Sequence, residues 1–286
     1  MKGNIQVKDE KIKLPKLGWV KLTEKISVDK IKYVVISRTA KRWFISLSVS
    51  FEPYKTLKKR ATIGVDLGVK VLATLSDGKT FENRKPYAQY KRKLKLAQRH
   101  LSKLYRKGQE QTKNYSKQLL KVQRLHYRIS CIRNDSIHRL TTYLAKNHSQ
   151  IAIEDLNVRG MSRNHKLASA ILDGGFYEFR RQLEYKTKWY GSELIIANRF
   201  YPSTKTCSHC GSIQSMSLNQ RVYNCPNCKI SIDRDLNAAI NLENILAKNA
   251  HVCAEDETSQ DCASDHPVKH DSAEILNKCG TFTGLN

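Results

Sequence analysis

The chain has 286 residues, and its 51 Lys and Arg side chains against 26 Asp and Glu give a formal net charge of +25 at pH 7. This length permits one large domain or two ordinary ones, and it excludes a short secreted peptide that needs disulfides to fold. An excess of positive charge favours a polyanionic partner, usually nucleic acid, with a solvated basic surface or an anionic membrane face as alternatives.

No stretch approaches the ~18 consecutive apolar residues of a membrane span. The N-terminal sequence MKGNIQVKDEKIKLPKLGWV also lacks the apolar core of a signal peptide. We therefore expect a soluble cytoplasmic protein that makes no membrane contact.

The first 83 residues predict strands. Residues 1–60 contain two β-like runs, IKYVVISRT and RWFISLSVSFEP, with basic turns around them, which indicate part of a small β-barrel or sheet. Residues 61–83 predict an apolar strand, a break marked by glycine, and a second strand that ends at an Asp77-Gly78 hairpin turn.

Residues 84–148 predict a long pair of helices with a break near Gly108. The segment 84–139 is rich in Lys and Arg, and its acids are Glu110 and Asp135. We interpret this pair as a phosphate-binding surface, and a solvated helical hairpin is the alternative. Five tyrosines are interleaved with the basic residues, and we expect them to pack in the hairpin rather than stack on bases: Tyr87, Tyr90, Tyr105, Tyr115 and Tyr127.

Residues 150–200 predict a strand (QIAIEDL), a polar loop, a helix (GFYEFRRQLEYKTKWYG) and another strand (ELIIANRF). A compact segment at 201–232 and a helix that ends near Leu246 follow. The remaining residues, 247–286, are acidic and have little periodicity, so they predict a flexible tail. This order of strands and helices is typical of a mixed α/β layer.

Four of the 8 cysteines have the spacing C-x2-C-x14-C-x2-C: Cys207, Cys210, Cys225 and Cys228. Each C-x2-C pair can form a tight turn that points two thiolates at one tetrahedral ion. We interpret the set as a structural zinc site, and two unrelated redox pairs are the alternative.

Asp66 and Glu154 each interrupt a run of apolar residues. Asp66 follows TIGV and Glu154 follows IAI, so both acids lie in strands that otherwise look buried. Burial of a lone carboxylate is costly unless a cation or hydrogen bonds compensate. Gly64 and Gly68 flank Asp66, and we expect them to let a phosphate backbone approach closely. For either acid alone, the alternative is a carboxylate at a strand end that is capped by a turn or paired to a basic helix.

A third acid stands before the helix LNAAINLENIL. Asp235 and Asp233 compete there for the helix N-cap, while Ala238 and Ala239 would let the helix lie close against a sheet. An acid from the first strand, one from a central strand and one from the last helix could converge on one edge of the sheet. Three carboxylates would then hold Mg²⁺ or Mn²⁺, and a two-metal pair ~3.5–4 Å apart can activate water at a phosphodiester.

Three blocks of the sequence resemble the TnpB/OrfB proteins of bacterial insertion sequences. They are IGVDLG at 63–68, IAIEDLNVRGM at 151–161, and the segments SHCGS, RVYNCPNC and DRDLNAAINL within 208–242. The resemblance implies a RuvC-like (RNase-H-type) nuclease core at 61–246 with an inserted zinc ribbon at 201–232. Part of an oligonucleotide-binding β-barrel at 1–60 precedes that core.

The same resemblance implies a transposon-encoded, magnesium-dependent DNA endonuclease that is associated with transposition and recombination. Its partners would be nucleoid DNA and, in the full-length family, a guide RNA. The family's catalytic acids fall on Asp66, Glu154 and Asp235, and its zinc ligands fall on the four paired cysteines. The choice of Asp235 over Asp233 rests on this resemblance.

The chain departs from the family pattern in two places. Family members of usual length begin with a helical lobe and the first barrel strands, whereas Met1 here opens in mid-barrel, so we expect an N-terminally truncated member. Lys229 also stands where the family commonly has glycine. A truncated nucleic-acid-binding regulator, or a decayed transposase product without cleavage activity, is the alternative function.

Overall fold

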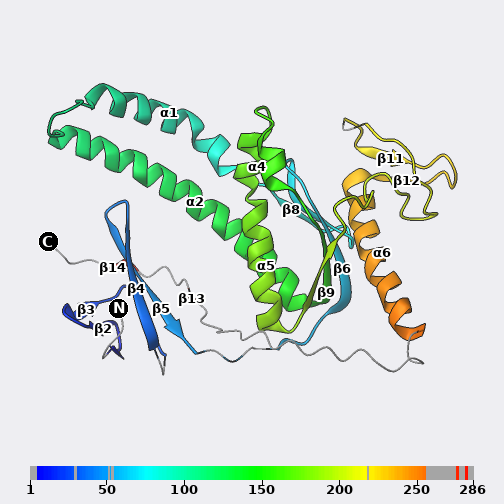
Figure 1. The fold of residues 1–286 in the computed structure, drawn as a ribbon, viewed down its shortest axis with the longest axis horizontal. Helices are drawn as coiled ribbons and strands as arrows, with labels where there is room; N and C mark the ends of the chain where they lie inside the picture. The colour runs from blue at the N-terminus through cyan, green and yellow to red at the C-terminus, as the bar shows by residue number, and fades with distance from the viewer. Residues whose placement is uncertain are drawn as a thin grey trace. The chain divides into compact units, whose positions relative to one another are not determined.

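The computed structural model describes residues 5–28, 31–50, 52, 55–217, 219–255, 275–276 and 281–282 (Figure 1). The chain divides into two compact units. One comprises Met1–Glu52, Arg92–Arg128 and Ala263–Asn286, and the other comprises Pro53–Lys91 and Ile129–Cys262. The domain limits expected at residues 60 and 246 stay predictions.

The first unit contains two small antiparallel sheets. One has the order β1-β2-β3, with the strands β1 (Gln6–Lys8), β2 (Lys11–Leu14) and β3 (Gly18–Lys21). In the other, β4 (Ile31–Thr39), β13 (Ile275–Leu276) and β14 (Thr281–Phe282) all pair with β5 (Arg42–Val49). The strands predicted at β4 and β5 are confirmed, and their apolar side chains share one core with those of β2 and β3.

The basic helical pair is confirmed as α1 (Pro86–Leu104) and α2 (Lys113–Asn147), with Gly108 in the connection at φ +70°. The side-chain amide of Gln118 donates to the Ala97 carbonyl at 2.9 Å and ties the two helices together. The rings of Tyr105 and Tyr115 lie 6.1 Å apart, and Tyr127 packs 5.8 Å from Phe44. Tyr105 and Tyr115 therefore pack within the hairpin, as predicted, whereas Tyr127 packs against a ring of β5.

The second unit is built on a five-stranded sheet of order β10-β9-β6-β7-β8. The strands are β6 (Arg60–Leu67), β7 (Val71–Leu75), β8 (Thr80–Glu82), β9 (His148–Glu154) and β10 (Glu193–Ala197). The first three strands are antiparallel, whereas β9 and β10 run parallel to β6. Three antiparallel strands extended by two parallel ones form the RNase-H-type sheet, so the expected α/β fold class is confirmed.

Helices cover both faces of this sheet (Figure 1). Ile63 and Ile151 point to one face, where they share a core with α2 and with α5 (Phe176–Tyr190). Ala152 points to the other face and packs with Leu242 of α6 (Arg234–Glu255). Because neighbouring residues of a strand point to opposite faces, the sequence already fixes which side chains meet α6.

Two predictions about the segments beside the sheet were wrong. The polar loop expected after β9 contains two short helices, α3 (Val158–Ser162) and α4 (Ala168–Gly174). Asn157 caps α3, and Asp173 at the end of α4 accepts the backbone N–H of Tyr87 at 3.0 Å. One local cap and one tertiary contact thus hold this segment, which lacks hydrophobic periodicity.

The last helix is also longer than predicted, because α6 continues past Leu246 to Glu255. Most of the acidic tail expected at 247–286 lies outside the described residues. In the described part of the chain, no helix has the length and apolar character needed to cross a membrane.

The backbone of α6 lies against the backbone of the sheet at Gly64. A Cβ atom at this position would lie 2.0 Å from the Ala239 carbonyl oxygen and 2.6 Å from the backbone nitrogen of Glu243. The expectation that Gly64 admits a phosphate backbone was therefore wrong, because the backbone of α6 occupies that space. Ala239 is fully buried here, so the predicted close approach of the alanine-bearing helix is confirmed.

We expect Gly64→Ala to lower the free energy of unfolding by about 3 kcal/mol, because the new methyl group meets backbone atoms that cannot rotate away. Gly78 is the matched control: it lies in a turn at φ +83°, and a Cβ atom there would have no neighbouring atom within 4 Å. Gly78→Ala should cost only about 1 kcal/mol. Urea unfolding followed by circular dichroism measures both. Equal losses of stability in the two variants would contradict the close backbone contact at Gly64.

A buried lysine joins α5 to α2. Lys186 is 4% exposed, and its ammonium group donates to the hydroxyls of Thr141 at 2.7 Å and Thr142 at 2.9 Å. It also lies 3.0 Å from Nδ1 of His138. Burial lowers the pKa of Lys186 to about 8, although the negative charge of Glu178 acts in the opposite direction.

This pKa predicts a pH-dependent stability. In the unfolded chain Lys186 has the ordinary pKa of 10.5, and in the folded protein its pKa is about 8. Below about pH 8 the folded protein is therefore destabilised by a buried ammonium charge. Between pH 8 and pH 10.5 the folded protein loses this proton while the unfolded chain keeps it, so the stability rises. Relative to Lys186→Met, the free energy of unfolding of the wild type should rise by on the order of 1 kcal/mol between pH 7.5 and pH 9.5. Urea unfolding of both proteins at the two pH values tests this, and a constant difference would refute it.

Candidate active site and metal centre

Asp66 and Glu154 lie side by side at the ends of two neighbouring parallel strands. Val65 of β6 is in register with Ile153 of β9, so the acids that follow them stand at the same level. Asp66 lies two residues after Gly64, and Glu154 two residues after Ala152. Both acids therefore belong to the sheet face that α6 covers.

The first turn of α6 brings Asp235 to the same place and resolves its competition with Asp233. The Asp233 carboxylate accepts the backbone N–H groups of Asp235 at 2.9 Å and Leu236 at 3.1 Å, so Asp233 is the N-cap. The Asp235 carboxylate is free of this role. It accepts hydrogen bonds from the Arg234 guanidinium at 3.0 and 3.1 Å.

The charges of the three predicted acids act on one another. Asp66 is 9% exposed, and burial raises its pKa well above the ordinary value. The negative charges of Glu154 and then Asp235 raise the pKa of Asp66 further, while Arg234 opposes them. Glu154 and Asp235 are thus near enough for their charges to act on Asp66, although the oxygens of the three acids do not all lie within 4.8 Å of one another among the described residues.

Asp155, next to Glu154, has a different role. It forms ion pairs with Arg180 at 2.7 Å and Arg199 at 2.5 Å. Hydrogen bonds from Arg199 lower the pKa of Asp155. These arginines belong to a hollow beside Glu154, whose rim also carries Arg159 and the 70% exposed Tyr177. The lining also carries the acids Glu154, Asp155 and Glu184, so the hollow mixes both charges and is open to solvent.

Ser203 was not predicted, yet its hydroxyl donates a short hydrogen bond to the Glu154 carboxylate. The loop that carries Ser203 is held by two buried amides of α6. Asn241 donates to the carbonyls of Ser203 and Thr206 at 2.7 Å each, and Asn237 donates to the Thr206 carbonyl at 2.7 Å. The spacing of the two asparagines, four residues apart on one helix face, was the signal in the sequence.

The four predicted cysteines form one cluster directly after this loop. Their sulfur atoms all lie within 4.8 Å of one another, and the Cys207–Cys228 and Cys210–Cys225 pairs are 3.6 Å apart. Four thiolates at ~2.3 Å from a tetrahedral zinc would lie about 3.8 Å apart, so the cluster fits this ion. The Ser212 hydroxyl contacts Cys210 at 3.2 Å and lowers the pKa of that thiol to about 5, whereas burial and the contact with Cys225 raise the pKa of Cys228 in the same cluster.

The cluster sits in a small ribbon with its own core. The strands β11 (Val222–Asn224) and β12 (Ser231–Asp233) form an antiparallel pair, and Tyr223 is fully buried against the cysteines. Each C-x2-C turn is followed by a residue in the left-handed region, Gly211 at φ +74° and Lys229 at φ +61°. The ribbon ends where α6 begins.

Two family models match this chain. The OrfB model of the IS605 group, described as "Probable transposase", matches residues 46–165, which include Asp66 and Glu154. The model described as "Cas12f1-like, TNB domain" matches residues 176–242, which include the four cysteines and Asp235.

Curated relatives extend this similarity along the chain. "Putative RNA-guided DNA endonuclease InsQ" of Escherichia coli K12 is 36% identical in an alignment that covers 94% of this chain and 68% of that protein. A "Putative RNA-guided DNA endonuclease" of Streptomyces pristinaespiralis is 40% identical and covers 73% of this chain. The match spans only about half (51%) of the Streptomyces protein.

Two solved structures also match, both at 21% identity. They are a CRISPR-Cas12f ternary complex, with a TM-score of 0.47, and a Cas12f1–sgRNA–target DNA complex, with a TM-score of 0.45. The matches cover 75% and 85% of this chain, and 45% and 65% of the respective solved chains.

The family models cover the segments that carry all of the predicted site residues. InsQ is more than one-third identical across almost the whole chain. The chain belongs to the TnpB/OrfB family.

Proposed function

We propose that this chain is a metal-dependent DNA endonuclease in which Asp66, Glu154 and Asp235 hold Mg²⁺ or Mn²⁺. The observation that supports this most directly is the buried Asp66 carboxylate at the end of the strand next to that of Glu154, where the charges of Glu154 and Asp235 both raise the pKa of Asp66. A buried carboxylate with two further half-buried carboxylates acting on it is unfavourable unless cations compensate. Carboxylate oxygens are the ligands that these hard divalent ions prefer.

Bound divalent cations would supply the activation of water and the stabilisation of the leaving oxygen. The chain's own residues hold the acids for this task. Ser203 orients Glu154 through its hydrogen bond, and Asp233 fixes the first turn of α6 by capping it. Arg234 offsets the charge of Asp235, and the arginines of the hollow beside Glu154 offer contacts to phosphates.

The nucleic-acid partners are part of the same proposal. InsQ is named as an RNA-guided DNA endonuclease, so we propose DNA as the substrate and a guide RNA as a partner. The net charge of +25 and the basic α1–α2 pair support both. We propose that the protein acts on nucleoid DNA during transposition and recombination.

A second candidate is nucleic-acid binding without cleavage. The ion pair between Arg234 and Asp235 favours it, because a guanidinium at 3.0 Å occupies an oxygen that a metal would need. The two candidates make opposite predictions for the acids, so one set of variants separates them.

We expect Asp235→Ala to reduce cleavage by about a thousandfold or more, because a metal site works as a unit. Asp233→Ala is the matched control. It should cost about 1 kcal/mol of stability through the lost cap and retain cutting at a temperature where the protein is folded. Labelled single- and double-stranded DNA, incubated with magnesium and with or without co-purified RNA, gives the rates, and fluorescence anisotropy gives the binding.

The result is decisive in each direction. Cutting that persists in Asp235→Ala and vanishes in Asp233→Ala would move the third ligand to Asp233. A wild type that binds DNA but never cuts, with every divalent cation tried, would favour the binding candidate.

For the ribbon we propose a structural Zn²⁺ held by Cys207, Cys210, Cys225 and Cys228. Metal analysis should find one zinc ion per folded chain, because four thiolates complete a tetrahedral site. Chelation should loosen the ribbon, since metal binding and folding are coupled in such sites. Folded protein free of zinc would overturn this assignment.

The two C-x2-C turns provide a matched pair of variants. Lys229 holds a left-handed conformation that glycine adopts without strain, so Lys229→Gly should stabilise the ribbon by about 0.5–1 kcal/mol. Gly211→Ala should destabilise it by a similar amount, since Gly211 has the same conformation. The chelator concentration that releases half of the zinc measures both, and shifts in the same direction would contradict the assigned geometry.

A further inference from the structure

Arg234 stands between the N-cap residue of α6 and the acid Asp235. Its side chain is 15% exposed, and two of its guanidinium nitrogens donate to one oxygen of the Asp235 carboxylate. Nε lies 3.1 Å and Nη2 lies 3.0 Å from Oδ1. A cation that belongs to the chain therefore already occupies this oxygen, which the proposed metal site would use.

The third nitrogen of the same guanidinium is bound outside the group of acids. Nη1 donates to the carbonyl of Gln220 at 3.0 Å, and Gln220 lies in the ribbon just before β11. The backbone N–H of Arg234 donates to the Arg221 carbonyl in the same stretch. The ribbon thus holds Arg234 by its main chain and by its side chain, so the position of the guanidinium does not depend on Asp235 alone.

Positive charge also reaches the other oxygen of Asp235 and the neighbouring acid Asp66. Nη1 of Arg221 lies 4.0 Å from Oδ2 of Asp235. Burial and the charges of Glu154 and Asp235 raise the pKa of Asp66, and the charge of Arg234 opposes them. Arg234 therefore compensates part of the negative charge at the site from within the chain.

We propose that Arg234 is an exchangeable counter-ion, which pairs with Asp235 in the metal-free chain and leaves Oδ1 when a divalent cation is bound there. The inference rests on the proposed function, because it takes Asp66, Glu154 and Asp235 as the ligands of that cation. A guanidinium has only donors and repels a divalent cation, so the two cannot share one carboxylate oxygen. With such an exchange the half-buried Asp235 has a cationic partner in either state, and a buried carboxylate without one is costly.

Only a side chain has to move in this exchange. The Asp233 carboxylate accepts the backbone N–H groups of Asp235 and Leu236, and this cap does not use the Asp235 side chain. Arg234 loses two hydrogen bonds to Oδ1, while its bond to the Gln220 carbonyl can persist. Arg234 should therefore weaken cation binding and stabilise the metal-free chain, and these two effects can be measured separately.

The test measures cation binding and stability instead of cleavage. The full chain is dialysed without a chelator, so that an ion bound to the four cysteines is retained, and is then titrated with Mn²⁺. The electron paramagnetic resonance signal of free Mn²⁺ gives the dissociation constant, and circular dichroism gives the melting temperature with and without the ion. The part of the binding that is lost in Asp66→Asn belongs to the three acids.

We expect Arg234→Gln to bind Mn²⁺ about tenfold more tightly than the wild type, because the guanidinium that competes for Oδ1 is gone. Without Mn²⁺ the melting temperature of this variant should fall by about 3–5 °C. Saturating Mn²⁺ should restore it to within about 1 °C of the wild type, since a tighter ligand stabilises the folded chain more. Arg234→Lys keeps the charge and should stay within about threefold of the wild-type affinity.

Arg60→Gln is the matched control for the lost charge. Arg60 pairs at 2.9 Å with Glu243, which lies on the same helix as Asp235 and about two turns further along it. The variant removes an arginine from an ion pair of α6 without touching the three acids. It should therefore leave the Mn²⁺ affinity within about twofold of the wild type.

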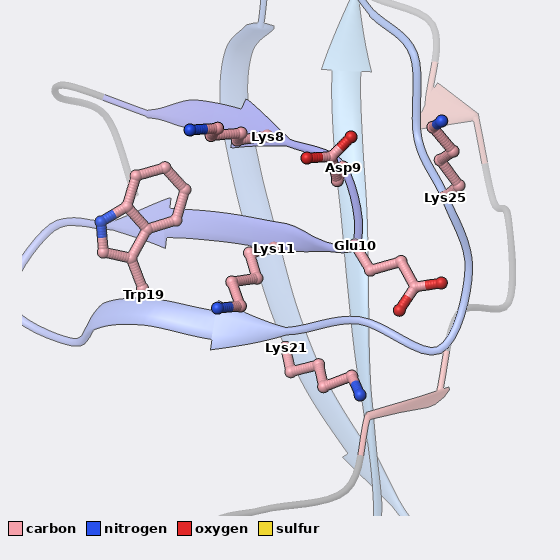
Figure 2. Close-up of a pocket in the computed structure, with 7 residues that line it drawn as sticks. All are labelled: Lys8, Asp9, Glu10, Lys11, Trp19, Lys21 and Lys25. Atoms are coloured by element: carbon pink, nitrogen blue, oxygen red, sulfur yellow. The ribbon is translucent and has the colours of Figure 1, made fainter.

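A second control concerns carboxylates outside the proposed metal site. Figure 2 shows such a place in the first unit, where Asp9 and Glu10 line a hollow together with Trp19 and lysine side chains. The lysines are Lys8, Lys11, Lys21 and Lys25. Their ammonium groups repel a divalent cation, so Glu10→Gln should also leave the Mn²⁺ affinity unchanged.

A measurement on the wild type makes the test independent of how well Arg234→Gln folds. In protein labelled with ¹⁵N-arginine, the Nε–H signal of Arg234 is assigned by its absence in Arg234→Lys. Saturating Mg²⁺, which is diamagnetic, should shift this signal, because Nε leaves Oδ1. The Nε–H signal of Arg60 should stay in place.

The exchange is overturned by an Mn²⁺ affinity of Arg234→Gln that equals the wild type or is weaker. A loss of melting temperature that is the same with and without Mn²⁺ would also overturn it, as would an Nε–H signal that stays in place at saturating Mg²⁺. The proposed metal site fails differently, because Asp66→Asn would then bind Mn²⁺ as the wild type does. A site that needs Asp66 but is indifferent to Arg234 would leave the metal proposal standing and remove this one.

Discussion

The contact between the backbone of α6 and the backbone of β6 at Gly64 is the constraint on which the second unit depends. Because no side chain separates them, α6 lies directly on the strand that carries Asp66. The first turn of the helix then holds Asp235 near enough for its charge to raise the pKa of Asp66. A larger residue at position 64 would lift the helix and separate the acid of the helix from the acids of the sheet.

The same helix connects the two candidate metal sites. Asn237 and Asn241 hold the loop that contains Ser203 and leads into Cys207. Ser203 in turn contacts Glu154. Order in the cysteine cluster is thereby transmitted to one of the acids through a short series of buried and part-buried hydrogen bonds, which are costly to leave unmade. The ribbon thus supports the acids physically and is more than their neighbour in the sequence.

The sequence was sufficient for the sheet, the long helices and the cluster of cysteines, because these rest on hydrophobic periodicity and on ligand spacing. It was insufficient for β1, β2 and β3, which have three or four residues each. It was also insufficient for α3 and α4, where tertiary hydrogen bonds such as that of Asp173 decide the conformation. Residue type could not decide which of Asp233 and Asp235 caps the helix, since aspartate is a good cap at either position. The sequence also predicted a phosphate backbone next to Gly64, where the structure has the backbone of α6.

Both ends of the ribbon are anchored to the beginning of α6. On the incoming side Thr206 and Ser208 are bound by Asn237, and on the outgoing side the backbone N–H of Arg234 donates to the Arg221 carbonyl at 2.8 Å. The ribbon is therefore a loop whose two sides are both attached to the beginning of one helix. A change in the length of the ribbon between these anchors would leave Asn237 and Arg234 in place on α6, and with them the attachment of the ribbon to the helix that carries Asp235.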